Sequence, residues 1–120
     1  MDQSDTQAST QVIDESVFEG LSALKADPAR WHLLMHRALT QCREFVETIS
    51  NAALHGDMDA CGKAVHALYG CAGSAGFVEV IALCDGFRAL ATAQKQNGAA
   101  QFASDLRDAC AALEHHIAKR

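Results

Sequence analysis

His66 stands in a setting that suits chemistry, unlike the other five histidines of the chain. A neutral imidazole offers a ring nitrogen as a nucleophile. Gly62 and Gly70 lie four residues before and after it, which places all three residues on one face of a helix. Each glycine in a helix interior forgoes about 0.8–1 kcal/mol relative to alanine. Bare flanks would let a second protein bring a reacting group to the ring, so they give His66 a reason to be exposed.

The residues around His66 divide into two faces when each is turned by about 100° along a helix. One face is apolar and comprises Cys61, Ala64, Val65, Leu68, Cys71, Ala72 and Ala75. The face of His66 comprises Asp59, Gly62, Lys63, Tyr69, Gly70 and Gly73. The pattern therefore predicts that His66 points to solvent from the middle of a helix over about 58–74. A surface histidine is usually no more than a solvated residue, and the glycines and Lys63 are what favour a role here.

Amphipathic helices must hold this one in place. Asp27-Pro28 is an N-cap followed by a proline at the first helical position. His55-Gly56-Asp57 ends the helix that starts there and caps the next, which ends at Gly76. The apolar positions of the first long helix recur every three or four residues: Trp31, Leu34, Ala38, Cys42, Phe45, Ile49 and Ala52.

Two further helices are predicted after Gly76, with Asn97-Gly98 as the turn between them. The first carries Phe77, Val80, Ile81, Cys84, Phe87 and Ala91, and the last carries Phe102, Leu106, Ala109, Cys110, Leu113 and Ile117. No stretch alternates with period two, so the expected fold is all-α, an antiparallel up-down four-helix bundle. A short additional N-terminal helix would cover one end, capped by Asp14, with a buried side formed by Val17, Phe18, Leu21 and Leu24.

Composition bounds the possible functions. The 120 residues suit one domain over 13–120, preceded by a polar segment over 1–12 that reads as a disordered tail or linker. The net charge of −5 argues against a general nucleic-acid binder. No apolar stretch approaches the roughly 20 residues of a membrane span, and the start does not resemble a secretory signal. We expect a cytoplasmic protein without direct membrane insertion.

Five cysteines, Cys42, Cys61, Cys71, Cys84 and Cys110, are spread through the apolar positions of the predicted helices. Their number is odd and no two form a CxxC pair, which disfavours a disulfide framework or a zinc site. A free thiol in such a position acts as a small apolar side chain. We expect all five to be reduced core residues.

The stretch from Ala64 to Gly76, AVHALYGCAGSAG, resembles the signature of histidine phosphotransfer (HPt) domains, roughly A-H-x-L-K-G-S-[SA]-[GA]-x-x-G. The residues that fit it are His66, Leu68, Gly70, Ala72, Gly73 and Gly76. The turn at Gly56-Asp57 and the run Ile81-Ala82-Leu83-Cys84 also resemble the family, so the likeness extends from about Ile13 to the C-terminus. It implies a four-helix bundle whose His66 takes a phosphoryl group from a receiver-domain aspartate and gives it to another receiver.

One position departs from that signature. The family usually has a lysine three residues after the histidine, where this chain has Tyr69, which offers a hydroxyl but no charge. Lys63, on the same face, is the expected substitute beside the phosphoryl oxygens. Gly70 would admit the receiver, and the docking face would comprise Asp59, Gly62, Gly70 and Gly73. Arg88 could approach this face, but the sequence does not fix its direction.

The resemblance also implies partners and excludes an activity. The partners would be response-regulator receiver domains and, in some settings, a hybrid sensor kinase. The polar segment before Ile13 suits a linker. It favours a domain at the end of such a kinase, tethered at the inner membrane, over a free-standing shuttle. The chain lacks a G-x-x-x-x-G-K-[ST] loop, so we expect no kinase activity of its own, and we expect a monomer without cofactor or metal.

Two other functions remain open at this point. The first is a helical docking module that binds receivers or kinases without being phosphorylated, for which Tyr69 is the argument and the glycine-flanked His66 the counterargument. The second is a metal or haem bundle built on His32 and His36, which lie four residues apart. No Glu-x-x-His pair supports the second, and His115-His116 read as surface residues.

Overall fold

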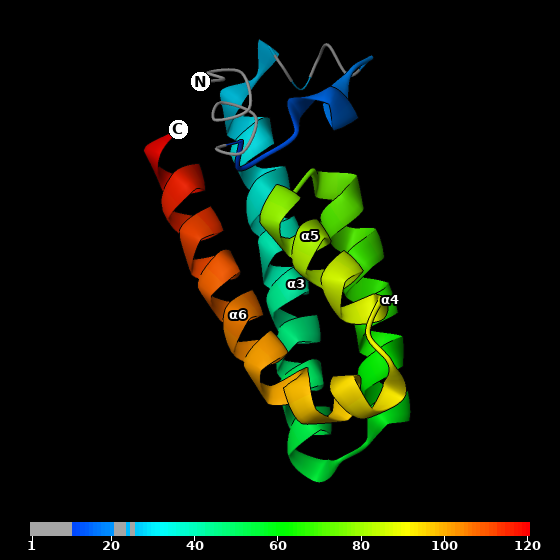
Figure 1. Cartoon of the computed structure of the whole chain (residues 1–120). Coiled ribbons are helices and arrows are strands. Elements are labelled where there is room, and N and C mark those ends of the chain that lie inside the picture. The colour runs from blue at the N-terminus through cyan, green and yellow to red at the C-terminus, as the bar shows by residue number, and fades with distance from the viewer. Residues whose placement is uncertain (1–10, 21–23, 25) are drawn as a thin grey trace, which may run out of the picture.

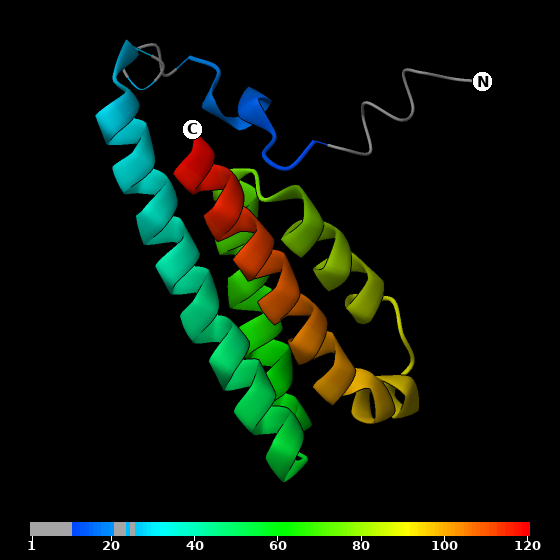
Figure 2. The same ribbon diagram turned by 90° about the vertical axis from the view of Figure 1, so that its left-hand side faces the viewer.

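Four α-helices run alternately down and up a common axis in the computed structural model, which describes residues 11–20, 24 and 26–120 (Figure 1). They are α3 (Pro28–His55), α4 (Met58–Ala75), α5 (Val78–Arg88) and α6 (Thr92–Lys119), preceded by the short 3-10 helix η1 (Glu15–Phe18). α3 packs against α4 and α6, and α5 packs against the same two helices (Figure 2). The predicted all-α antiparallel four-helix bundle with an additional short N-terminal helix is confirmed.

The caps predicted for α3 and α4 are present. The Asp27 carboxylate accepts the N–H of Arg30 at 3.2 Å, and Pro28 occupies the first turn of α3. Gly56 ends α3 in the left-handed region with a φ of 69°. Asp57 then caps α4, accepting the N–H of Ala60 at 3.1 Å. These caps satisfy backbone groups that have no partner inside a helix, and they fix where the His66 helix begins.

The turn predicted at Asn97-Gly98 is wrong, because α6 begins at Thr92 and continues through both residues. The connection from α5 is instead residues 89–91, so Ala91 lies outside α5, and the Gln94 side chain accepts the N–H of Ala91 at 3.1 Å. Gly98 costs a helix about 1 kcal/mol. Burial of Phe102, whose ring stacks on Phe87 with centroids 4.2 Å apart, offsets that cost. As a result, the residues just after Thr92 lie on a helix beside α4 rather than in a loop.

The buried face of α3 is turned slightly from the predicted one. Its buried residues are Trp31, Met35, Leu39, Cys42, Val46, Ile49 and Ala52. Leu34 and Val17, both predicted to be buried, are 40% and 38% exposed. Leu34 fits the spacing of three and four, but Met35 takes the inward position on α3. Phe18 and Leu24 are buried as predicted, whereas Leu21 lies outside the described residues.

The segment before the bundle is bonded to the junction between α4 and α5. The N–H of Asp14 donates to the carbonyl of Gly76 at 2.7 Å, and the N–H of Val78 donates to the carbonyl of Val12 at 3.2 Å. Gly76 has a φ of 74°, and a Cβ there would lie 2.6 Å from the Asp14 carbonyl oxygen. Both the backbone conformation and the close approach therefore require glycine at this position.

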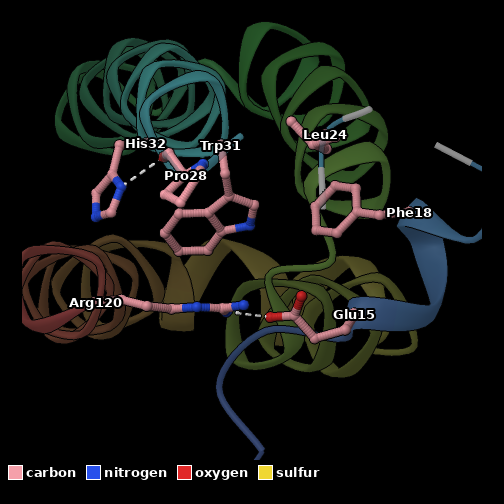
Figure 3. Close-up of a pocket in the computed structure, with 7 residues that line it drawn as sticks. All are labelled: Glu15, Phe18, Leu24, Pro28, Trp31, His32 and Arg120. Carbon is pink, nitrogen blue, oxygen red and sulfur yellow. Dashed lines mark hydrogen bonds and ion pairs between the residues drawn. The ribbon is translucent and has the colours of Figure 1, made fainter. Parts of the chain in front are cut away.

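A cavity of about 380 Å³ lies between η1, the start of α3 and the end of α6 (Figure 3). Arg120 forms an ion pair with Glu15, and its Cζ lies 4.2 Å from the centre of the Trp31 ring. The indole N–H of Trp31 is buried and has no partner among the described residues. No lining residue of this cavity belongs to α4, so it is separate from the surface around His66.

Candidate functional site

His66 is exposed near the middle of α4, as the sequence pattern predicted. The opposite side of the helix packs into the core through Cys61, Ala64, Val65, Leu68, Ala72 and Ala75. Caps at both ends and this buried side hold the helix rigidly against α3 and α5. The imidazole is thus a solvent-facing group on a fixed support, which is the arrangement that a group-transfer reaction with a second protein needs.

The glycines beside His66 are not required by the fold of the chain. A Cβ built on Gly62, Gly70 or Gly73 meets no described atom within 4 Å, and none of the three has a positive φ. Gly76 at the end of the same helix shows what a required glycine looks like, with a positive φ and a blocked Cβ. The three glycines therefore forgo helix stability without any gain inside the described chain. Because none of the three has a side chain, the imidazole is not screened at these positions.

On one flank of His66 lies a cavity of about 450 Å³ with walls from α4, α5 and α6. It is lined by Met58, Gly62, Val65, His66, Phe87, Arg88, Thr92 and Lys95. Two of these residues are cations, and neither comes from the helix that carries His66. Because Arg88 ends α5 and Lys95 lies near the start of α6, the short connection over 89–91 brings both charges to the same side of the imidazole.

Arg88 is held against α4 by Tyr69. Its Cζ lies 4.6 Å from the centre of the Tyr69 ring, which is within cation–π distance. An interaction of this kind at an exposed site contributes about 0.5–1 kcal/mol and also fixes where the guanidinium lies. Tyr69 is therefore a platform for a cation that comes from another helix. The direction of Arg88, which the sequence left open, is toward the His66 face.

Lys95 was not singled out from the sequence. Besides lining the cavity, its ammonium partly opposes the rise in the pKa of Cys61 that burial causes, which places its charge close to the first turns of α4. The signal was hidden because the expected turn at Asn97-Gly98 left Lys95 in no predicted helix. Only the observed start of α6 at Thr92 shows which way it faces.

Lys63 lies on the other side of His66 from Tyr69, and it is already paired. Its Nζ is 3.2 Å from a carboxylate oxygen of Asp59, and the two side chains are 79% and 82% exposed. An ion pair this exposed contributes little and exchanges readily. Lys63 does not line the cavity that contains Arg88 and Lys95. Lys63 is thus a third cation near His66, and the Asp59 carboxylate competes for its charge.

On the Lys63 side, a groove of about 740 Å³ runs between α3 and α4 and reaches η1. Its walls include Ala67, Gly70, Cys71 and Ser74 from α4 and the exposed Leu34 from α3. Of the predicted docking residues, Asp59, Gly62 and Gly70 are exposed, and Gly73 is half-buried. His66 therefore stands between a cationic cavity and a largely apolar groove, and the bare Gly70 joins the imidazole to that groove.

His32, one of the two histidines of the alternative metal or haem hypothesis, makes contacts on its own helix. The Nδ1 of His32 lies 2.8 Å from the carbonyl of Pro28, and its ring meets Trp31 edge-on with centroids 5.0 Å apart. Within residues 11–20, 24 and 26–120, no three histidine, cysteine or acidic side chains are grouped so that they could hold a metal ion. None of the helices described is long and apolar enough to cross a membrane.

Comparison with known proteins identifies a family. A family model described as "Hpt domain" matches residues 34–116, a range that contains all of α4 and α5 and most of α3 and α6. It therefore covers His66 together with Tyr69, Arg88 and Lys95. No curated protein and no solved structure matches the chain.

Proposed function

Since the chain belongs to the histidine phosphotransfer (Hpt) domain family, whose members relay phosphoryl groups in two-component phosphorelays, we propose that His66 is its phosphoacceptor. His66 would take the group from an aspartate of one response-regulator receiver domain and pass it to another. The observation that carries this is the pair of glycines beside the exposed imidazole, for which the described chain gives no internal reason. Hpt domains lack an ATP-binding kinase fold, so the phosphoryl group must arrive from a partner.

The proposed step needs few groups from this chain. A ring nitrogen of His66 attacks phosphorus as the bond from phosphorus to the aspartyl oxygen breaks, with the two in line. Negative charge stays on the three equatorial oxygens of a loose transition state, so positioning and charge stabilisation supply most of the catalysis. The rigid α4 provides the positioning. The reverse step returns the group to the next receiver by the same geometry.

Arg88 and Lys95 are the proposed source of positive charge on one side of the phosphoryl group. Arg88 replaces the usual lysine in function, because Tyr69 holds its guanidinium beside the site instead of bringing a charge of its own. A planar guanidinium suits phosphoryl oxygens because it can donate two parallel hydrogen bonds. Lys63 would contribute from the other side once it leaves Asp59.

The docking surface for the receiver would be the face that contains Asp59, Gly62, Gly70 and Gly73, continued by the groove between α3 and α4. Leu34 and Val17 give that groove exposed apolar area, which interface centres commonly contain. The partners proposed are receiver domains and a sensor kinase that bears one. We further propose that the chain acts in the cytoplasm. We also propose that it acts as a monomer, because one copy presents the whole site.

Incubation with a phosphorylated receiver domain tests the proposal. We expect one acid-labile, base-stable phosphate per chain, which His66→Gln abolishes while helical circular dichroism is unchanged. His36→Gln is the matched control and should leave labelling intact, because His36 is also an exposed histidine on a long helix of the bundle, α3. Label that persists in His66→Gln, or that peptide mapping places on another histidine, would overturn the assignment.

An unphosphorylated docking module is the second candidate, and Tyr69 in place of the family's lysine is the observation that favours it. Binding and transfer separate the two. A receiver panel that binds the parent chain, loses affinity with Gly70→Gln and yet never labels His66 would make docking the function. Labelling of His66 in the parent chain by any of these receivers would exclude the unphosphorylated docking module.

A further inference from the structure

Two cysteines on different helices of the bundle touch each other. Cys42 of α3 and Cys71 of α4 are 29 residues apart in sequence, and their sulfurs lie 3.4 Å apart. Cys42 is fully buried, whereas Cys71 is half-buried. The other three cysteines, Cys61, Cys84 and Cys110, are buried. Among the described residues, this is the one hydrogen bond between two sulfurs.

The two sulfurs of the pair have different protonation preferences. The Cys42 thiol donates a hydrogen bond to the sulfur of Cys71, which lowers the pKa of Cys71 to about 7 although partial burial opposes the shift. The same contact, with burial, raises the pKa of Cys42. As a thiol, Cys71 can also donate to the Ala38 carbonyl, but that contact is longer at 3.6 Å. Cys71 is therefore the group that provides a thiolate, and the thiolate is the reactive form of cysteine.

Access to the pair is one-sided. Cys71 lines the groove between α3 and α4, together with Ala67, Gly70 and Ser74, and Cys42 does not line it. The small side chains beside Cys71 leave its sulfur open to a small molecule in the groove. Cys42 lies behind that sulfur, in the core. A small oxidant that entered the groove would meet Cys71 first and would leave Cys42 in position to react second.

We propose that Cys71 and Cys42 form a reversible intramolecular disulfide when the protein meets hydrogen peroxide. The Cys71 thiolate attacks one peroxide oxygen, so that a sulfur–oxygen bond forms, the O–O bond breaks and the departing hydroxide takes up a proton to become water. The sulfur of Cys42 then attacks that of Cys71. The S–S bond forms, the sulfur–oxygen bond breaks, and the leaving hydroxide takes the Cys42 proton as a second water. Two electrons pass from the two thiols to the peroxide.

The movement required is small. The sulfurs must approach from 3.4 Å to about 2.05 Å, the length of a disulfide bond. The bond would tie α3 to α4 five residues after His66, along the wall of the groove that we assign to the receiver. It would not involve His66 itself. The site therefore stands whether or not His66 is phosphorylated, and the two proposals fail separately.

Mass spectrometry of the reduced full-length chain tests the proposal. After treatment with hydrogen peroxide, the unfolded protein is alkylated at its remaining thiols. We expect three of the five thiols to be labelled, an intact mass lower by two hydrogens before labelling, a linked peptide joining Cys42 to Cys71, and full reversal by dithiothreitol. Five labelled thiols after treatment, or a linkage through Cys61, Cys84, Cys110 or a second chain, would overturn it.

Variants separate the two sulfurs. Cys42→Ala should still oxidise but should stop at a sulfenic acid on Cys71, which dimedone traps. Cys71→Ala should leave every remaining thiol free. Cys110→Ala is the matched control, because it removes a buried cysteine outside the pair and should keep the disulfide. Dimedone bound to Cys110 in the Cys42→Ala variant, or a disulfide that still forms in Cys71→Ala, would contradict the order proposed. The parent measurement stands even if a variant fails to fold.

Discussion

The guanidinium of Arg88 lies over the ring of Tyr69, with its Cζ 4.6 Å from the ring centre. This contact joins the last residue of α5 to the helix of His66 and sets a cation beside the imidazole. The position at which the family usually has a lysine thus contributes charge indirectly, through an aromatic platform. The arrangement separates two properties of Tyr69, its ring and its hydroxyl, and each can be removed alone.

Replacing Arg88 with alanine should slow phosphotransfer to His66 about tenfold, which corresponds to about 1.4 kcal/mol in the barrier. Tyr69→Phe keeps the platform and should transfer at the parental rate, whereas Tyr69→Ala should approach the Arg88→Ala rate. Single-turnover transfer from a phosphorylated receiver measures all three. Equal loss in Tyr69→Phe and Tyr69→Ala would show that the hydroxyl, and not the stacked arginine, is what matters.

Removal of Lys63 should have a smaller effect than removal of Arg88. Lys63 is bound to Asp59 and lies outside the cavity, so only part of its charge is available to phosphoryl oxygens. We expect Lys63→Ala to slow transfer by a few-fold, and Asp59→Asn, which frees the lysine, to leave the rate equal or higher. Tyr69→Lys, which restores the family pattern, should recover part of the loss in a Lys63→Ala background. A Lys63→Ala variant slower than Arg88→Ala would reverse this ranking.

Gly70→Gln should stabilise the bundle and still slow transfer. The new Cβ meets no described atom, and glutamine is the better helix former by somewhat less than about 1 kcal/mol. The side chain would nonetheless stand between His66 and the groove. Gly86→Gln on α5 is the matched control, since Gly86 is also helical, exposed and open, two residues from Arg88 and so on another face of α5. The midpoint temperature of thermal unfolding should rise in both variants, and the rate of phosphotransfer should fall in Gly70→Gln alone.

Gly76→Ala should destabilise the protein, in contrast to Gly73→Ala three residues earlier. The left-handed conformation at position 76 costs a residue with a Cβ about 1–2 kcal/mol, and the clash with the Asp14 carbonyl adds to that. Position 73 has neither restriction, so alanine there should raise stability slightly. Urea unfolding of the two variants measures the difference. A Gly76→Ala variant as stable as the parent would mean that the contact with Asp14 does not form.

Acid should weaken the pairing of α3 with α6. Arg107 holds the pKa of Glu47 below its ordinary value of 4.5, and Arg43 does the same for Glu114. Groups with lowered pKa values in the folded state stabilise it above the ordinary pKa, and that contribution is lost as the pH falls through the lowered one. The free energy of unfolding should therefore decline below about pH 4.5, by a small amount because both pairs are exposed. Glu47→Gln should show a shallower decline in urea titrations at successive pH values.

Local signals in the sequence were sufficient for most of the fold. Asp27, Gly56, Asp57 and Gly76 act within a few residues of their own positions, so the ends of α3 and α4 could be predicted from them. The turn predicted at Asn97-Gly98 also rested on a local preference, and that prediction was wrong. Its local preference for a turn is real, but the burial of Ala99 and Phe102 on the neighbouring turns of α6 outweighs it, and burial depends on the partner helices.

The site was predictable only where one helix carries it. His66, Gly62 and Gly70 share α4, so their common face follows from helical spacing. Arg88 and Lys95 reach the same surface from two other helices, and their directions depend on where the connection over 89–91 ends. Cys42 and Cys71 illustrate the same limit. Both were expected in the core, where Cys42 is buried and Cys71 is half-buried, but the contact between them belongs to the packing of α3 on α4.

The hydrogen bond from Asp14 to the Gly76 carbonyl gives the bundle a mechanical asymmetry. The chain ahead of Pro28 is anchored to the corner between α4 and α5, and not only to α3, which it continues into. A pull or twist applied ahead of Val12 would therefore load the end of the His66 helix first. Residues 12–14 therefore reinforce the end of the bundle at which α4 meets α5, opposite the 89–91 connection.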